Sequence, residues 1–145
     1  MTIYEQVADS EILDLARHMQ SMRAKIIPLF PREVLRDSVL DILLELFVAQ
    51  LMTRSVCIKE LIIVSGETST SALRRIDRLE ESGMVRRCHD PVDHRRVAVA
   101  LTQRGDEAMR AMLHHLFLDK ESTNSRVKAV NSQALPSSGL QPKPN

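Results

Sequence analysis

Apolar residues recur at helical spacing near the start of the chain. Over residues 9–27 they repeat every three or four positions, which predicts an amphipathic helix, and Asp9 or Ser10 is suited to cap its first turn. Pro28 and Pro31 interrupt this pattern, because the residue before a proline is sterically disfavoured in the helical conformation. The sequence therefore predicts one helix that ends at this pair of prolines.

The most apolar segment, residues 32–52, predicts a second helix with apolar side chains on nearly every side. Such a helix belongs at the centre of a core. The aliphatic run within it, residues 39–52, is interrupted by Asp41, Glu45 and Gln50 and is shorter than the roughly 20 residues that a membrane-spanning helix needs. We therefore expect a buried core helix and no association with a membrane.

A glycine-containing turn separates two short helices in the middle of the chain. The first is expected over residues 59–65 and ends at Gly66, since glycine readily adopts the left-handed conformation that follows many helices. The second begins after an N-cap at Thr68 or Ser69 and ends before Gly83. Two short helices joined by such a turn are typical of a helix-turn-helix.

The following segments predict a small sheet and a last helix. Residues 84–89 and 96–101 have the composition of strands, and the turn-forming residues 90–95 join them as a hairpin, while residues 56–58 form a very short third strand. Thr102 can cap the last helix. Its apolar stripe consists of Met109, Met112, Leu113 and Leu116. This order of elements predicts a mainly α fold with a small antiparallel β-wing, which is a winged helix-turn-helix.

The chain divides into four segments. Residues 1–29 contain the first helix, residues 30–101 the winged helix-turn-helix, and residues 102–118 the last helix. Residues 119–145 carry hardly any large apolar residue, so we expect this tail to be disordered. The two terminal helices have apolar stripes without an obvious local partner, and we expect them to hold a homodimer together. The residues expected in that contact are Ile12, Leu15, Met19, Met109, Met112 and Leu116.

The overall charge is close to neutral. The 145 residues, 43% of them hydrophobic, fit one domain, and 20 Lys and Arg against 19 Asp and Glu give a net charge of +1. Any binding to nucleic acid must therefore depend on local clusters of charge. Cys57 and Cys88 lie far apart in sequence and form no C-x-x-C pair, so we expect free thiols and a reducing, cytoplasmic location.

Patterns that support catalysis or metal binding are missing from the sequence. It contains no glycine-rich phosphate loop and no nucleophile elbow. His114 and His115 are adjacent and would point about 100° apart around a helix, so they cannot share a metal as an i, i+4 pair can. We expect no enzymatic activity, no cofactor and no metal.

Arginine and hydroxyl side chains share one face of the second helix of the helix-turn-helix. At about 100° per residue, one arc of this helix is apolar and should face the core. That arc contains Ala72, Leu73, Ile76 and Leu79. The opposite arc contains Thr70, Ser71, Arg74, Asp77, Arg78 and Glu81, with Arg75 at its flank. The planar fork of arginine matches the edge of guanine, and hydroxyl groups at a helix start can donate to phosphates.

Two explanations fit these charges. Either the arginines contact DNA, or Arg74 and Arg78 pair with Asp77 and Glu81 on an ordinary solvated face, with Asp93 serving only as a turn former. The glycine turn before the helix and the arginine-containing hairpin after it favour DNA binding. A winged helix that docks on another protein is the alternative function.

Three motifs resemble the MarR-type transcriptional regulators. They are Leu73-Arg-Arg-Ile-Asp-Arg-Leu-Glu-Glu-Ser-Gly83, Asp90-Pro-Val-Asp-His-Arg95 and Leu101-Thr-Gln-Arg-Gly105. In this order and spacing they are specific, and the resemblance spans about residues 30–113. The sequence departs from the family at Glu67, where a buried apolar residue is usual, and at Lys59, which replaces a small hydroxyl cap.

The resemblance implies a homodimeric transcriptional regulator that binds a pseudo-palindromic site in double-stranded DNA. The second helix of the motif would enter the major groove, and the arginine of the Asp93-x-Arg95 pair would reach the minor groove. The resemblance also implies a possible small-molecule effector, bound between the dimer helices and the DNA-binding lobe. The expected DNA-binding residues are Ser69, Thr70, Ser71, Arg74, Arg75, Arg78, Asp93, His94, Arg95 and Arg96.

Overall fold

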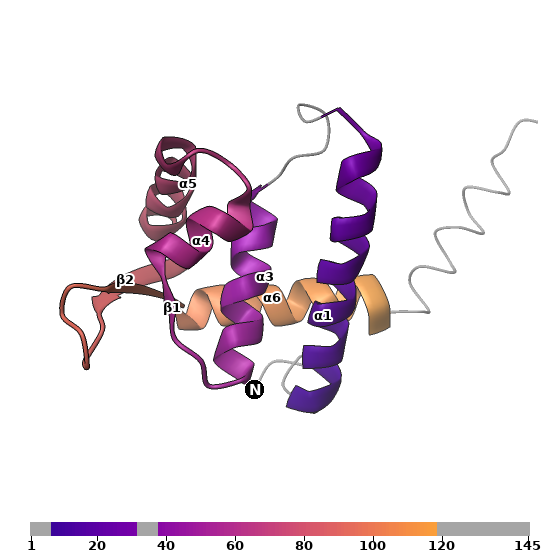
Figure 1. Cartoon of the computed structure of the whole chain (residues 1–145). Coiled ribbons are helices and arrows are strands. Elements are labelled where there is room, and N and C mark those ends of the chain that lie inside the picture. Colours follow the sequence, from indigo (N-terminus) through magenta and orange to yellow (C-terminus); the bar gives the residue numbers. More distant parts are fainter. Residues whose placement is uncertain (1–6, 32–37, 119–145) are drawn as a thin grey trace, which may run out of the picture.

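The computed structural model describes residues 7–31 and 38–118, which form a mainly helical fold with one small antiparallel sheet (Figure 1). This confirms the expected fold class. The helices are α1 (Asp9–Ile26), α3 (Ser38–Leu51), α4 (Ile58–Ser65), α5 (Ser69–Glu81) and α6 (Gln103–Leu113), with the short helical turns η2 (Ile27–Leu29) and η3 (His114–Leu118). The strands are β1 (Val56–Cys57), β2 (Val85–His89) and β3 (Val97–Leu101). The expected disorder of residues 119–145 and the expected helical start at residues 32–37 lie outside the described residues.

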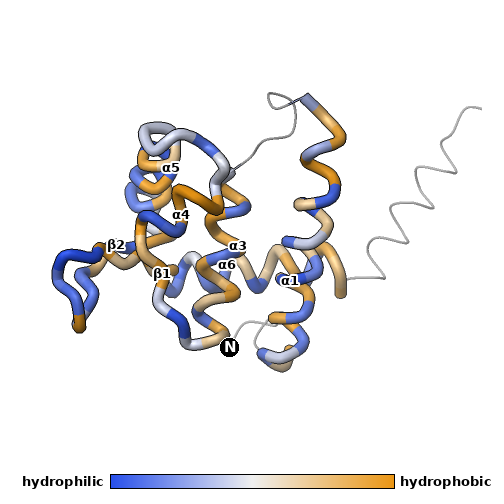
Figure 2. The backbone as a smooth tube through the Cα atoms, viewed as in Figure 1, coloured by the Kyte–Doolittle hydropathy of each residue, from blue (hydrophilic) through white to orange (hydrophobic). Residues whose placement is uncertain are grey.

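The central helix of the fold is α3, as expected from its apolar composition. It packs against α1, α4, α5, α6 and β3, and Figure 2 shows that much of its length is hydrophobic. Ile42, Leu44 and Phe47 on this helix are fully buried, because neighbours cover it on several sides. Among the helices of the described residues, none has the length and apolar character needed to cross a membrane.

The apolar stripes of α1 and α6 are partly buried within the chain itself, which corrects the expectation for two of their residues. Ile12 is 1% exposed and Met109 is 3% exposed, because both helices pack against α3 and against each other. Two ion pairs accompany this packing: Arg23 with Asp41 of α3 at 2.7 Å, and Arg110 of α6 with Asp9 of α1 at 2.9 Å. Ile12 and Met109 therefore do not need a second copy of the chain to become buried.

The turn between α4 and α5 is fixed by side-chain hydrogen bonds at both ends. Gly66 ends α4 with a φ of 63°, in the left-handed region that glycine tolerates. Ser65 Oγ accepts a hydrogen bond from the amide of Glu67 at 3.1 Å, and Thr68 Oγ1 accepts one from the amide of Ser71 at 3.2 Å. Thr68 is therefore the N-cap of α5, one of the two expected caps.

The sheet has the strand order β1-β3-β2, with both pairs antiparallel. After β3, Thr102 caps α6 by accepting a hydrogen bond from the amide of Gly105 at 3.1 Å, and its hydroxyl donates to the carbonyl of Gly83 at 2.5 Å. Gly105 fits against the backbone of Met84 so closely that an added Cβ would lie 2.1 Å from that carbonyl oxygen. This junction places the ends of α5, β3 and α6 together.

Candidate nucleic-acid interface

Two arginines on the exposed face of α5 are not held by carboxylates. Arg74 and Arg78 are exposed, and neither forms an ion pair within residues 7–31 and 38–118. Asp77, the carboxylate three residues after Arg74, pairs instead with Arg87 of β2 at 2.5 Å. Asp77 therefore does not pair with Arg74 or Arg78, as it would on an ordinary solvated helix face.

Arg87 connects α5 to the sheet. Its guanidinium lies 2.5 Å from Asp77 and 3.5 Å from Glu80, and its backbone amide donates to Glu80 at 3.2 Å. Arg87 was not among the expected site residues. Sequence reasoning missed it because the pairing that sets Arg87 opposite Val99 is a tertiary feature. The signal in the sequence was the three-residue spacing of Asp77 and Glu80, which places both on one side of α5.

The flank of α5 carries a small hollow. Ser71, Arg74, Arg75 and Arg78 line this space of about 120 Å³. Of the three arginines, Arg75 has a carboxylate partner: its Nε lies 3.5 Å from Oε2 of Glu67, in the turn before the helix. The hollow is polar and cationic, as a site for a phosphate group would be.

The first turn of α5 combines hydroxyl groups with free amides. Ser69 and Thr70 are exposed there, and the leading amides of a helix have no acceptor within the helix. One expectation about this helix is wrong: Leu73 is 37% exposed and does not face the core. It lies at the edge of the apolar arc, about 100° from Ala72, which is fully buried.

The β2–β3 hairpin, residues 90–96, presents an exposed arginine. Figure 1 shows it projecting at the end of the molecule opposite α1, which is also the end that carries α5. Asp93 Oδ1 accepts hydrogen bonds from the amide of Arg95 at 3.1 Å and from its Nε at 3.2 Å. Asp93 thus forms a turn and also pairs with Arg95, whose side chain is 93% exposed. His94 is exposed beside it.

Asp90 fixes the start of the same hairpin. Its carboxylate accepts hydrogen bonds from the backbone amides of Val92 at 2.8 Å and Asp93 at 3.3 Å, which lower the pKa of Asp90. Val92 is 92% exposed at the tip. The hairpin therefore has a defined turn, beside which Arg95 remains exposed.

Arg96 lies at the base of the hairpin and turns toward α4. Its Nη2 is 3.3 Å from the sulfur of Cys57 and 3.3 Å from Oε1 of Glu60. The structure therefore brings together Arg74, Arg75 and Arg78 on α5 and exposes Arg95 on the hairpin, but it pairs Arg96 with another element. A groove of about 530 Å³, lined by Ile63, Arg95 and Arg96 among others, runs between α4 and this base.

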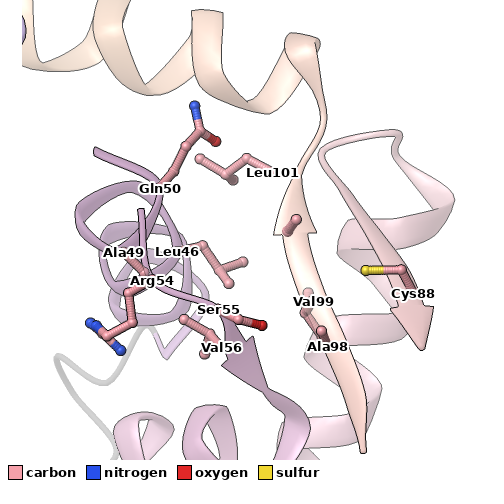
Figure 3. A pocket seen from close by; sticks show the side chains of 11 residues that line it. Leu46, Ala49, Gln50, Arg54, Ser55, Val56, Cys88, Ala98, Val99 and Leu101 are labelled. Carbon is pink, nitrogen blue, oxygen red and sulfur yellow. The ribbon is translucent and has the colours of Figure 1, made fainter. Parts of the chain in front are cut away.

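The two thiols lie on separate hollows. Cys57 of β1 and Cys88 of β2 are both free, and each is the partner of Ala98 on one side of β3. Two strand spacings separate them by about 10 Å, beyond the roughly 7 Å limit between the Cα atoms of a disulfide. Cys88 lines an apolar cavity of about 150 Å³ between α3 and the sheet (Figure 3). Within the described residues, no group of three or more His, Cys, Asp or Glu could hold a metal ion.

Solved structures share this fold, although sequence comparison identifies no relative. No family model matches the sequence, and no curated protein matches it. MepR from S. aureus, crystallised in complex with DNA, is 16% identical over 81% of this chain and 93% of its own, with a TM-score of 0.51. AF1382 from Archaeoglobus fulgidus is 17% identical over 60% of this chain and 92% of its own, with a TM-score of 0.50. MarR from E. coli is 19% identical over 90% of this chain and 98% of its own, with a TM-score of 0.48. At these identities the likeness establishes the fold, and the chain has the fold of MepR and AF1382.

Proposed function

We propose that the chain is a sequence-specific DNA-binding transcriptional regulator of the MarR type. The observation that carries this proposal is the charge arrangement on α5. Arg74 and Arg78 are exposed without carboxylate partners among the described residues, while Arg87 pairs with the neighbouring Asp77 and Glu80 and offsets one of their two negative charges. The shared fold of MepR, which was crystallised with DNA, supports the proposal.

In this proposal α5 enters the major groove with its N-terminal half leading, because the N-terminal residues of a recognition helix normally contact base edges. Arg74 and Arg78 then contact bases, with guanine as the preferred partner. Ser69, Thr70 and Ser71 donate hydrogen bonds to phosphates with the help of the helix start.

The hairpin reaches the adjacent minor groove in this arrangement. Arg95 is the residue best exposed for that contact, and Asp93 orients it through the two hydrogen bonds described above. His94 lies beside the minor groove. Arg96 contributes less, because Glu60 and Cys57 already engage its guanidinium.

A homodimer is part of the proposal, with a contact surface revised by the packing of the terminal helices. Ile12 and Met109 are buried in the chain's own core, whereas Leu116 remains 56% exposed. Leu15, Met19 and Met112 are half-buried. A two-fold dimer would place its recognition helices about 34 Å apart, one helical turn along the DNA.

The groove between α4 and the hairpin base is a candidate location for a small-molecule effector, different from the expected one between the dimer helices and the DNA-binding lobe. Its volume of about 530 Å³ lies in the usual range of ligand pockets, roughly 300–1,000 Å³. A molecule bound there would contact both Arg95 and Arg96.

A DNA titration at two salt concentrations tests the proposal. Fluorescence anisotropy with fragments from the source genome, at about 50 mM and about 200 mM salt, should show binding that weakens with a log–log slope of about −0.9 per neutralised phosphate. No detectable binding at the lower salt concentration would contradict the proposal and favour the alternative, a winged helix that docks on another protein.

A further inference from the structure

Glu67 is a carboxylate in an unusual position, inside the turn between α4 and α5. Its side chain is 13% exposed, and its amide is tied to Ser65 Oγ at 3.1 Å. Within the described residues, Oε2 of Glu67 is buried and accepts no hydrogen bond. Among the described residues, Glu67 forms one ion pair, with Arg75, whose Nε lies 3.5 Å from Oε2. Glu67 is therefore poorly satisfied except by the charge of Arg75.

Arg75 sits between this carboxylate and the proposed DNA interface. Its side chain is 35% exposed, and it lines the same hollow as Ser71, Arg74 and Arg78. The hollow would accept a phosphate oxygen, and the other two arginines there have no carboxylate partner in the described residues. Arg75 differs from them because Glu67 compensates its charge.

We infer that Glu67 keeps Arg75 paired within the protein and thereby lowers by one the number of DNA phosphates that each recognition helix neutralises. A phosphate could capture Arg75 only by leaving the buried carboxylate of Glu67 without its counter-charge, which is unfavourable. The inference rests on the proposed function and names a residue that sets its general affinity.

The consequence concerns the general affinity for DNA. Phosphate contacts strengthen binding to every DNA sequence alike, whereas base contacts discriminate between sequences. One fewer phosphate contact per subunit lowers the affinity for cognate and random DNA by the same factor and leaves the contribution of Arg74 and Arg78 unchanged. Glu67 therefore lowers the general affinity for DNA without changing the ratio between cognate and random binding.

The test compares four variants of the full chain on one random-sequence duplex over a range of salt concentrations. Glu67→Gln removes the charge that holds Arg75, and Glu67→Leu does so with an apolar side chain. Glu81→Gln is the matched control, because it makes the same change in net charge at an exposed residue of α5 that has no ion-pair partner in the described residues. Glu67→Gln with Arg75→Gln removes both partners. Far-UV circular dichroism verifies that each variant is folded.

The measured quantity is the slope of the logarithm of the binding constant against the logarithm of the salt concentration. Both single variants at Glu67 should show a slope steeper than that of Glu81→Gln by about 0.9 per subunit. The ratio of their DNA affinity to that of Glu81→Gln should then fall by about 3.5-fold for each subunit when the salt concentration is raised about fourfold. The double variant should lose the whole gain and return to the wild-type slope.

The outcomes separate this inference from the proposed function. Equal slopes for the Glu67 variants and Glu81→Gln, or a gain that persists without Arg75, would overturn the inference while wild-type binding still supports the function. Binding by the Glu67 variants alone would support the inference and contradict the function. Absence of binding by every variant would overturn both.

Discussion

The arginines of α5 and β2 differ in whether a carboxylate pairs with them. Arg87 is bound to Asp77 and Glu80, and Arg75 lies beside Glu67, whereas Arg74 has no such partner among the described residues. Because an unpaired guanidinium retains its five donors, Arg74, like Arg78, is free to bind a base edge. DNA recognition as proposed depends first on these two side chains.

Replacing Arg74 with alanine should weaken binding to the cognate site, as selected from a random pool of duplex DNA, more than binding to random DNA. We expect a loss of about 1–3 kcal/mol on the selected site, the usual value of a bidentate contact to a base. Competition titrations with both duplexes provide the measurement. Lys25→Ala, on α1 at the other end of the molecule, removes the same charge and should change neither affinity by a comparable amount. Equal losses on both duplexes would show that Arg74 contacts only phosphate.

Arg87→Ala tests the neutralisation of the carboxylates on α5. The free energy of unfolding should fall by no more than about 1 kcal/mol, because partly exposed ion pairs contribute little. DNA affinity should also fall, for every sequence, because α5 then carries one more negative charge that no cation offsets. Urea denaturation and anisotropy titrations measure the two effects.

A triple variant supplies the control for that prediction. Adding Asp77→Asn and Glu80→Gln to Arg87→Ala removes the unpaired carboxylates and should restore much of the binding. Continued weak binding would mean that Arg87 acts by orienting α5 and not by neutralising it.

At the scale of elements, the junction of α5, β3 and α6 depends on two glycines with different requirements. Gly105 has no room for a side chain, since a Cβ would lie 2.1 Å from the carbonyl oxygen of Met84. Gly83 has room, with Arg104 no closer than 3.6 Å, but its φ of 77° is costly for other residues. The first requirement is steric and the second is conformational.

Gly105→Ala should therefore destabilise the protein more than Gly83→Ala. We expect a loss of about 3 kcal/mol for the first, from overpacking against the backbone, and of about 1–2 kcal/mol for the second, from the left-handed conformation. Urea denaturation followed by circular dichroism measures both free energies of unfolding. A smaller loss for Gly105→Ala would show that the backbone at Met84 shifts easily.

Local chemistry made many of the elements predictable from sequence. Thr68 and Thr102 each lie just before a helix and accept a hydrogen bond from the amide three residues later, so capping preferences locate both helix starts. Gly66 likewise marks the end of α4. The arrangement of Thr70, Arg74 and Arg78 on one exposed face followed from helix periodicity alone.

Tertiary contacts were beyond such reasoning. The pairs Arg87 with Asp77 and Arg96 with Glu60 join residues of separate elements, and periodicity within one element cannot reveal them. Leu73 was misplaced because residues at the edge of an apolar arc are buried only where a neighbouring element happens to cover them.

At the scale of the whole molecule, the terminal helices were expected to be held mainly by a second copy of the chain. An apolar stripe such as that of α1 shows that another surface must cover it, but not whether that surface belongs to the same chain or to a second copy. Because α3 is apolar on several sides, it accommodates both α1 and α6. Of the residues expected in the dimer contact, Leu116 is exposed and Leu15, Met19 and Met112 are half-buried. Further exposed apolar residues lie at or after the end of α1: Ile26, Leu29 and Phe30.

Sedimentation equilibrium tests the dimer. The wild-type chain should be dimeric at micromolar concentration, and Leu116→Glu should shift it toward the monomer by burying a charge in the contact. Ile63→Glu is the matched control, because Ile63 is 80% exposed on α4, which lies on the opposite side of α3 from α1 (Figure 1). A monomeric wild-type chain would contradict the homodimer.

Selection of bound sequences from a random pool of duplex DNA tests the central claim most directly. A dimer that inserts two copies of α5 into successive major grooves should enrich an inverted repeat, with half-site centres about 10–10.5 base pairs apart. The same selection with Arg74→Ala should relax the preference at one position of each half-site. A pool that remains random after repeated rounds at low salt would contradict the account.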